Sequence, residues 1–462
     1  MGMEHGALLC SRRGRIAMRR LSLIVLVTLC AASTEAADWY VRPDGGSYGS
    51  ANGADWSNAF EGFANIAWAR VAPGDTIWVA GGTYTRRLVP AKSGTAESPI
   101  SVRRARADAA ECTRAAGWRA EYDDTVHQIR AGLTFNSFDY ITISGRTTAA
   151  GGSYGWWIDF QGARSGPGIE WPNDSNGSHI LVEYIDLQGP GNITYSSDGR
   201  GIDDTPFSSA TNHTFSHMAI HGWESGVYVV GMSKPTFEHI DMYDIMALNW
   251  SDYHPNGIYT SGAPGGTVRY SSFHKGPDGN GVGEGIFFEQ SGGSTDWLIY
   301  GNVFYDLDQV GWKAIEISSA VGAIKVFNNT FDNIRLGSLY RSDNSSCTGG
   351  EWRNNLNIDA GDSTCGKASN NVTAKSADVF VDRAERDYRI VATTGSGFPR
   401  NAGTDLSSVF KRDANGVTFG ADGAWDVGAY EHDGRCPSCP DPAPGPTPTA
   451  PSAPTGLRVI GP

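Results

Sequence analysis

The sequence is short of positive charge. Its 37 lysine and arginine residues are outnumbered by 50 aspartate and glutamate residues, which leaves a formal net charge of −13 at pH 7. A chain with this balance repels nucleic acid and anionic membranes over most of its surface. We therefore expect neither as a partner, and a polyanionic substrate would require a local basic patch or bridging cations.

Long hydrophobic runs are also scarce. The one extended apolar run in the N-terminal region, residues 21–30, is too short to span a bilayer. It follows the basic residues 18–20 and precedes a small-residue cleavage site at 34–36, which is the pattern of an export signal. We predict that residues 1–36 are a signal peptide, with 1–17 as extra upstream residues, and that the mature protein is secreted.

Cysteine is rare, with seven residues in 462, and two of them leave with the signal peptide. Because export permits disulfides, we predict the pairs Cys347–Cys365 and Cys436–Cys439, with Cys112 left free. The spacing of Cys436 and Cys439 also allows a redox-active or zinc-binding pair, which remains an alternative.

Glycine, in contrast, is abundant, and together with many Asn, Ser and Thr residues it indicates an all-β protein with many turns. A small residue followed by an aliphatic one recurs at steps of 33, 25, 31, 28 and 29 residues. A repeat of this length with strand-like residues in each unit predicts stacked coils rather than one globular core. The pairs are Gly168-Ile169, Gly201-Ile202, Gly226-Val227, Gly257-Ile258, Gly285-Ile286 and Ala314-Ile315.

A second family of strand-like segments accompanies these pairs. Apolar and polar residues roughly alternate within each segment, as strands with one buried face require. Asn302, Asn329 and Asn355 recur in matching contexts, and identical polar residues stack directly in a solenoid. We therefore predict that these asparagines form a structural ladder. The segments are 180–189, 214–222, 236–244, 267–275, 297–306, 324–333 and 351–359.

The N-terminal region carries a family resemblance. Residues 40–46 read YVRPDGG, 73–84 read PGDTIWVAGGTY and 93–100 read SGTAESPI, and residues 59–71 between them have mostly helical spacing. Together they resemble the N-terminal cap and first coil of secreted right-handed parallel β-helix proteins. This pectate-lyase-like group includes many polysaccharide lyases. The resemblance implies an all-β right-handed parallel β-helix, or solenoid, over residues 37–434, with a short N-terminal capping helix.

The C-terminal region divides into three parts. Residues 378–432 resemble the closing segment of the same family, where two strands complete the last coils. Residues 435–450 are rich in proline and read as an extended linker. Residues 451–462 resemble the truncated start of a fibronectin type III module.

The repeat also predicts which side chains share a face. If the aliphatic residue of each pair points inward, the next residue points outward, and this row contains Glu170, Asp203, Tyr228, Tyr259, Phe287 and Glu316. The residue before each pair gives a second row, at the start of each strand, with Arg200, Ser225, Asn256, Glu284 and Lys313. We predict that Asn256, Glu284 and Lys313 lie on one line, with His254 and Glu316 close by.

Acids, bases, cations and aromatic residues in one strip suit a carbohydrate cleft. The indoles of Trp223 and Trp312 would stack on sugar rings, and we assign Asn256, Tyr259 and Glu316 to substrate binding as well.

Cleavage of a uronate polymer by β-elimination needs a neutralised carboxylate, a base and an acid. The catalytic candidates are His254 and Lys313 as the base, Arg200 and Lys313 as the neutralising cation, and Glu284 as a further charged group. Ca²⁺ held by Asp203, Asp204 and Asp252 is the alternative neutraliser.

Three other functions remain open. A glycoside hydrolase would use a carboxylate pair such as Glu284 with Glu316, or Asp203 with Glu284. A uronate C5-epimerase shares the first proton abstraction with a lyase, and Asp252 and His254 keep the acid-x-His order of such enzymes but not their full motif. A non-catalytic β-helix could display its aromatic residues for glycan binding. We favour a monomeric lyase whose partner is a polysaccharide.

Overall fold

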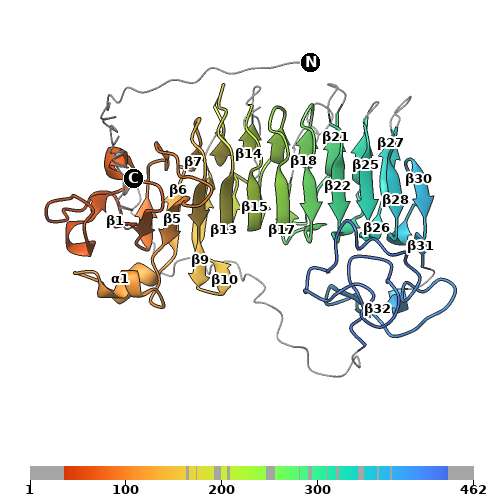
Figure 1. The fold of residues 1–462 in the computed structure, drawn as a ribbon. Coiled ribbons are helices and arrows are strands. Elements are labelled where there is room, and N and C mark those ends of the chain that lie inside the picture. Colours follow the sequence, from red (N-terminus) through yellow and green to blue (C-terminus); the bar gives the residue numbers. More distant parts are fainter. Residues whose placement is uncertain are drawn as a thin grey trace, which may run out of the picture. The chain divides into compact units, whose positions relative to one another are not determined.

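The chain folds into stacked coils of parallel β-strands (Figure 1). The computed structural model describes residues 36–162, 166–172, 174–191, 199–204, 209–245, 255–279, 281–289, 294–309, 311–318, 322–341, 348–361, 364–374 and 377–434. Within these ranges only two small sheets are antiparallel, β9 (Arg146–Thr148) with β10 (Gly151–Tyr154) and β32 (Phe380–Asp382) with β33 (Asp387–Ile390). The predicted all-β solenoid is therefore confirmed.

Twenty-one strands form one large sheet that bends into two stacks. The first stack contains β1 (Asp38–Arg42), β3 (Thr76–Val79), β5 (Ile100–Arg104), β8 (Ile141–Ser144), β13 (Ile180–Gln188), β15 (Thr214–His221), β17 (Thr236–Tyr243), β19 (Thr267–Arg269), β22 (Trp297–Tyr300), β25 (Ile324–Phe327), β28 (Glu351–Arg353) and β30 (Lys367–Ser369), and β2 (Phe60–Glu61) pairs with β1.

The second stack runs beside the first. It contains β4 (Gly82–Tyr84), β6 (Val126–Ile129), β11 (Trp156–Asp159), the C-terminal halves of β13, β15 and β17, and then β20 (Ser272–His274), β23 (Val303–Leu307), β26 (Thr330–Ile334), β29 (Leu356–Ala360) and β31 (Val372–Thr373).

A separate sheet of eight strands forms the remaining side of the coils. Its strands are β7 (Leu133–Thr134), β12 (Ile169–Glu170), β14 (Arg200–Asp204), β16 (Ser225–Val229), β18 (Asn256–Thr260), β21 (Glu284–Phe288), β24 (Lys313–Ile317) and β27 (Leu339–Arg341). Every small–aliphatic pair of the sequence repeat lies at or in one of these strands, so the repeat marks this sheet.

The bend between the two stacks is made by residues in the left-handed conformation. Tyr184, His217 and His239, in the middle of β13, β15 and β17, have φ angles of 57°, 52° and 53°. Their rings stack on one another with centroids 4.6 and 4.4 Å apart. In later coils Asn328 and Asn354 occupy the bend. Asparagine tolerates the left-handed conformation, so the bend there does not depend on stacked rings.

One residue beyond the bend lies the predicted asparagine ladder. Asn302 donates from Nδ2 to Oδ1 of Asn329 at 2.9 Å, and Asn329 donates in the same way to Asn355 at 3.1 Å. The ladder continues from Asn355 to Asn371. Asn302, Asn329 and Asn355 are fully buried, so these bonds satisfy polar groups inside the coils. The structural interpretation of the asparagines is confirmed.

The aliphatic members of the repeat form a buried row along the eight-stranded sheet. Ile258, Ile286 and Ile315 are in register on β18, β21 and β24, and none of them is exposed to solvent. The residue before each isoleucine is small for a steric reason. A Cβ atom at Gly257, for example, would lie 2.5 Å from the carbonyl oxygen of Gly285 in the next coil. Close approach of neighbouring coils explains the pattern.

The N-terminal cap differs from the expected helix. Residues 59–71 form β2 and two short 3₁₀ turns, η2 (Phe63–Asn65) and η3 (Trp68–Arg70), after η1 (Trp56–Asn58). Phe63 and Ile66 lie three residues apart across η2 and are both buried, which fits the three residues per turn of a 3₁₀ helix. Gly62, at a φ of 64°, separates the strand from the turns. The cap still packs on the core, as predicted.

In the described ranges, the one α-helix is α1 (Ala110–Arg114), and the short 3₁₀ helix η4 (Ala120–Asp123) follows it. Cys112 of α1 is buried and free, as predicted. No helix in these ranges has the length and apolarity that a membrane crossing requires.

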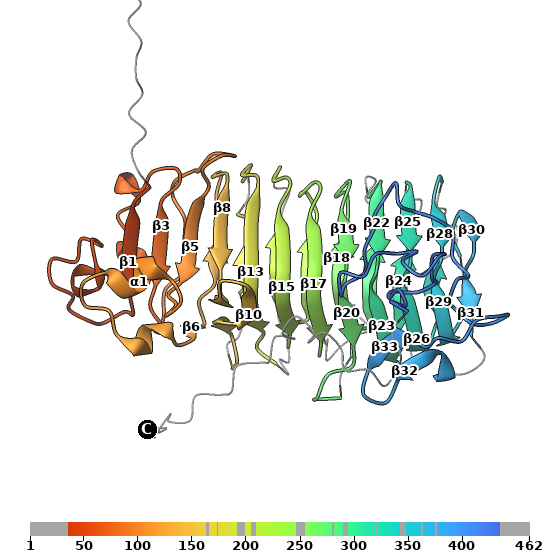
Figure 2. The ribbon, with the colours of Figure 1, turned by 60° about the horizontal axis from the view of Figure 1, so that its bottom comes forward.

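The C-terminal segment does not complete the coils. After β31, the 3₁₀ helix η5 (Ala377–Val379), the β32–β33 hairpin and irregular chain lie along the flank of β25, β28 and β29 (Figure 2). Nδ2 of Asn328 donates to the carbonyl groups of Asp426 and Gly428, and Phe410 stacks on Tyr300 at 4.4 Å. The expectation that residues 378–432 add strands to the last coils is therefore wrong, because this segment bonds sideways to bend residues of earlier coils.

Candidate functional site

The predicted alignment at the start of the strands is present in the eight-stranded sheet. Asn256 of β18 pairs with Glu284 of β21, and Glu284 pairs with Lys313 of β24. One turn of coil separates each from the next, so their side chains occupy equivalent positions on neighbouring strands. Glu316 follows three residues after Lys313 on the same strand, and it contacts that lysine.

Lys313 sits between two carboxylates. Its Nζ atom lies 3.1 Å from Oε1 of Glu284 and 2.5 Å from Oε2 of Glu316, and all three side chains are almost completely buried. Burial alone would lower the pKa of Lys313, but Glu284 and Glu316 outweigh it and hold the pKa above the usual lysine value. In this arrangement Lys313 is an ammonium group.

An outward row of aromatic side chains runs beside this cluster. Tyr228 and Tyr259 stack face to face with ring centroids 4.2 Å apart, and Phe287 meets Tyr259 edge-on at 5.7 Å. The hydroxyl of Tyr259 donates a hydrogen bond to Glu289. At the end of the row, Tyr340 of β27 lies under Lys313, whose Nζ atom is 4.9 Å from the ring centroid.

Arg200 closes the other end of the row. Its guanidinium lies 3.7 Å from the ring centroid of Tyr228 and 3.1 Å from Oδ1 of Asp203. Four strand pairings separate β14 from β24, which at about 4.8 Å each places Arg200 roughly 19 Å from Lys313. The two cations therefore cannot act on the same sugar ring, and Arg200 is not part of one catalytic group with Lys313.

Three predicted site residues belong to the interior instead. Trp223 donates from Nε1 to the carbonyl of Leu187, and both Trp223 and Trp312 pack in the main hydrophobic core, to which Tyr259 and Phe287 do not belong. Asp204 is fully buried, and its Oδ2 atom accepts hydrogen bonds from the backbone of Gly231 and Met232. The assignment of the two indoles to sugar stacking and of Asp204 to metal binding is wrong, because these groups face the core.

Several predictions fall outside the described residues. These are the roles of Asp252 and His254, and of Cys347, Cys436 and Cys439. Cys365 is disulfide-bonded, in agreement with a disulfide at that position.

Tyr340 was not among the predicted site residues. Ser338 and Leu339 continue the small–aliphatic repeat, and Leu339 pairs with Ile315 in the structure. The spacing of 24 residues from Ala314 was shorter than the other steps of the repeat. Extending the repeat by this one coil would have placed Tyr340 in the outward row.

The donor set beside Lys313 fits Ca²⁺ better than the predicted aspartates do. Asn256, Glu284 and Glu316 contribute amide and carboxylate oxygens, the ligands that Ca²⁺ prefers, and two of them already hold a cation in the form of Lys313. Asp203 is engaged by Arg200. Asp203 with Asp204 is not such a set, because Asp204 is buried and bonded to the backbone of Gly231 and Met232.

A second acidic group lies in the C-terminal segment. The carboxylates of Asp422, Asp426 and Glu431 lie within 4.8 Å of one another. Burial, together with Asp426, raises the pKa of Glu431 to about 8. Both oxygens of Glu431 accept backbone hydrogen bonds, from Gly420 and Asp426. These bonds give the group a structural role in the fold of the segment.

Comparison with known proteins rests on structure. No protein-family model and no curated protein matches the sequence. Pectate lyase Pel9A superimposes with a TM-score of 0.54 at 18% identity, over 86% of this chain and 97% of that one. The fold is that of a pectate-lyase-like parallel β-helix.

Two further solved structures are more distant. The PL6 family alginate lyase AlyGC has a TM-score of 0.42 at 12% identity, over 85% of this chain and 57% of that one. A rhamnogalacturonan lyase has a TM-score of 0.41 at 13% identity, over 79% of this chain and 96% of that one. The 18% identity to Pel9A supports the fold alone, and the chemistry has to come from the site.

Proposed function

We propose that this protein is a secreted lyase that cleaves a uronate-containing polysaccharide by β-elimination. The observation that carries the proposal is the buried cluster of Lys313 with Glu284 and Glu316, in register with Asn256 and beside a row of aromatic rings. A proton-transfer group next to cation ligands is what the reaction needs, and the rings suit a chain of sugars.

In the reaction, a base removes the proton on the carbon next to the uronate carboxylate. The electrons of that bond form a carbon–carbon double bond, and the bond to the glycosidic oxygen breaks as the oxygen gains a proton. We assign the proton abstraction to Lys313, with His254 as the other candidate. Tyr228 and Tyr259 would contact neighbouring sugars, and Arg200 would bind a carboxylate further along the chain.

Lys313 has to lose its proton to serve as a base. Its ammonium form is held by Glu284 and Glu316, and it would lose that support if those oxygens bound a different cation. Asn256, Glu284 and Glu316 are the residues that would hold Ca²⁺, which would neutralise the carboxylate of the substrate. Deprotonation of Lys313 and neutralisation of the substrate would then occur at the same place.

The arrangement disfavours a carboxylate-pair hydrolase. Such an enzyme needs one carboxyl group protonated, so that it can donate to the leaving oxygen. Glu284 and Glu316 instead both lie against Lys313, which donates to them as hydrogen-bond acceptors.

The test is incubation of the mature protein with a panel of acidic polysaccharides, with Ca²⁺ or with a chelator. We expect the ultraviolet absorbance of an unsaturated uronate to appear, and to disappear with the chelator. New reducing ends without that absorbance would establish hydrolysis and overturn the proposal. Binding without any cleavage would overturn it in favour of a glycan-binding module.

The variant Lys313→Ala should lower the rate by about 10²–10⁴-fold, the usual contribution of a positioned acid or base. Lys325→Ala, on the outward face of β25 in the first stack, is the matched control and should leave the rate unchanged. Equal activity of both variants would remove Lys313 from the mechanism.

A further inference from the structure

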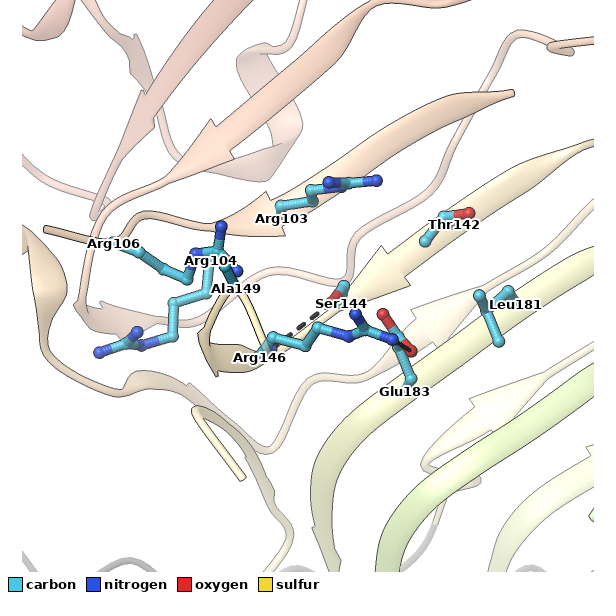
Figure 3. Close-up of a pocket in the computed structure, with 9 residues that line it drawn as sticks. All are labelled: Arg103, Arg104, Arg106, Thr142, Ser144, Arg146, Ala149, Leu181 and Glu183. Carbon is cyan, nitrogen blue, oxygen red and sulfur yellow. Dashed lines mark hydrogen bonds and ion pairs between the residues drawn. The ribbon is translucent and has the colours of Figure 1, made fainter. Parts of the chain in front are cut away.

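A second polar site lies on the first stack, in the N-terminal coils. It is a pocket of about 370 Å³ that carries four arginines in a chain of net charge −13 (Figure 3). The residues that line it are Arg103, Arg104, Arg106, Thr142, Ser144, Arg146, Ala149, Leu181 and Glu183.

Three adjacent coils build the floor of this pocket. Arg103 of β5 pairs with Ser144 of β8, and Ser144 pairs with Glu183 of β13. The β9–β10 hairpin, which is inserted after β8, contributes Arg146 and Ala149. None of the lining residues lies on the eight-stranded sheet, so the pocket is separate from the cluster around Lys313.

Three of the four guanidinium groups have a carboxylate partner. The ion pairs are Arg104 with Asp123 at 2.9 Å, Arg106 with Asp108 at 3.1 Å and Arg146 with Glu183 at 2.8 Å. Arg104 also donates to the backbone carbonyl of Asp124, which fixes it as part of the wall.

Arg103 differs from the other three. In the described part of the chain its side chain makes no hydrogen bond or ion pair, and Figure 3 draws no dashed line to it although Arg146 beside it is bonded to Glu183. The Arg103 side chain is exposed at the mouth of the pocket. Partial desolvation lowers its pKa, and of its charged neighbours Glu183 raises the pKa whereas Arg106 and Arg146 lower it. The pocket therefore presents one positive charge that the protein itself does not neutralise.

We propose that this pocket binds the carboxylate of an acidic sugar residue. A guanidinium fork matches a carboxylate with two parallel hydrogen bonds, and Arg103 has its donors free for that purpose within the described structure. Thr142 and Ser144 offer hydroxyl groups to sugar hydroxyls, and Leu181 offers an apolar surface to the ring.

The choice of a sugar as the carrier of the anion rests on the proposed function. A polysaccharide held at Arg103 and at the Lys313 cluster would be bound at two places, which raises its effective concentration at the cleavage site. An inorganic oxyanion has the same bonding chemistry, so the experiment has to separate the two sources.

Hydrogen–deuterium exchange measured by mass spectrometry can locate the ligand. The protein would carry Lys313→Ala, so that the probes are not cleaved. The probes are tetramers of galacturonate, mannuronate and guluronate, a neutral galactose tetramer and inorganic phosphate. We expect at least one acidic tetramer to slow exchange in peptides that cover residues 100–106 and 142–149, and the neutral tetramer to have no effect.

With Arg103→Ala added, about ten times more tetramer should be needed to give half-maximal protection, which is the usual effect of losing a charged hydrogen-bond partner. Arg412→Ala removes the same charge from an exposed position in the C-terminal segment and should change nothing. Because Arg103 has no partner in the described structure, the melting temperature should stay constant in both variants.

Two results would overturn the proposal. Protection by phosphate but by none of the acidic tetramers would make the pocket an inorganic anion site, and absence of protection by any probe would remove the site. The outcome is independent of cleavage. Protection without lyase activity in the parent protein would support the proposed pocket and overturn the proposed lyase function. Lyase activity without protection would support the lyase function and overturn the pocket.

Discussion

The asparagine ladder permits a quantitative prediction for Asn329→Ala. The side chain of Asn329 is completely buried. Its Oδ1 accepts from the backbone N–H and from Nδ2 of Asn302, at 3.0 and 2.9 Å. Its Nδ2 donates to the carbonyls of Ile299 and Phe327 and to Asn355, at 3.0, 3.1 and 3.1 Å.

Alanine would leave the N–H of Asn302 buried without an acceptor, which costs about 1–3 kcal/mol, and would remove further hydrogen bonds worth about 1 kcal/mol each. We expect the free energy of unfolding to fall by about 3–5 kcal/mol. Asn371→Ala is the comparison at the end of the ladder. It also removes the acceptor of a backbone N–H, that of Asn355, but the Asn371 side chain is only half-buried and water can take its place, so it should cost less, about 1–2 kcal/mol.

The measurement is urea-induced unfolding monitored by tryptophan fluorescence, in which the dependence of the unfolding free energy on urea concentration is also compared between variants. Equal losses for Asn329→Ala and Asn371→Ala would refute the reasoning, because burial would then not decide the effect. A loss below about 1 kcal/mol for Asn329→Ala would show that the coils close up around the smaller side chain.

Three further predictions concern charge and packing. Glu284→Gln should lower the pKa of Lys313, because one of its two carboxylate partners is lost. The rate of acylation of Lys313 as a function of pH, followed by peptide mass spectrometry, reports this pKa. An unchanged pH profile in the variant would contradict the prediction. Burial lowers the pKa of His213 to about 3. The contribution of the neutral imidazole to stability is therefore present above pH 6.5 and is lost as the pH falls toward 3. In that pH window, the melting temperature of His213→Gln should depend less on pH than that of the wild type. Gly257→Ala should destabilise the protein by about 1–3 kcal/mol in thermal unfolding, since its Cβ would press on the carbonyl of Gly285, and a wild-type melting temperature would show that the coils can separate.

The sequence predicted those parts of the structure that repeat. A residue that recurs once per coil has the same environment each time, so the small–aliphatic pairs identified the eight-stranded sheet and Asn302, Asn329 and Asn355 identified the ladder. For the same reason the line of Asn256, Glu284 and Lys313 could be derived from spacing alone.

Residues outside the strands were harder to place. Trp223 follows Gly222, whose φ of 70° turns the chain and sends the indole into the core, and strand alternation gives no information at such a turn. Asp204 is a different case, because alternation along β14 does place it inward, behind Asp203. The assignment of both Asp203 and Asp204 to one Ca²⁺ site did not take into account that neighbours on a strand face opposite sides.

The shared register of the eight-stranded sheet has a consequence for how such a site can change over evolution. Each coil contributes one outward side chain to the row from Asp203 to Tyr340, and neighbouring coils are about 4.8 Å apart. Duplication or loss of one whole coil would therefore lengthen or shorten the row by a single position. The separation of Arg200 from Lys313 can change only in such steps. Under the proposed function, the number of sugars between the two charged ends would then be set by the number of coils.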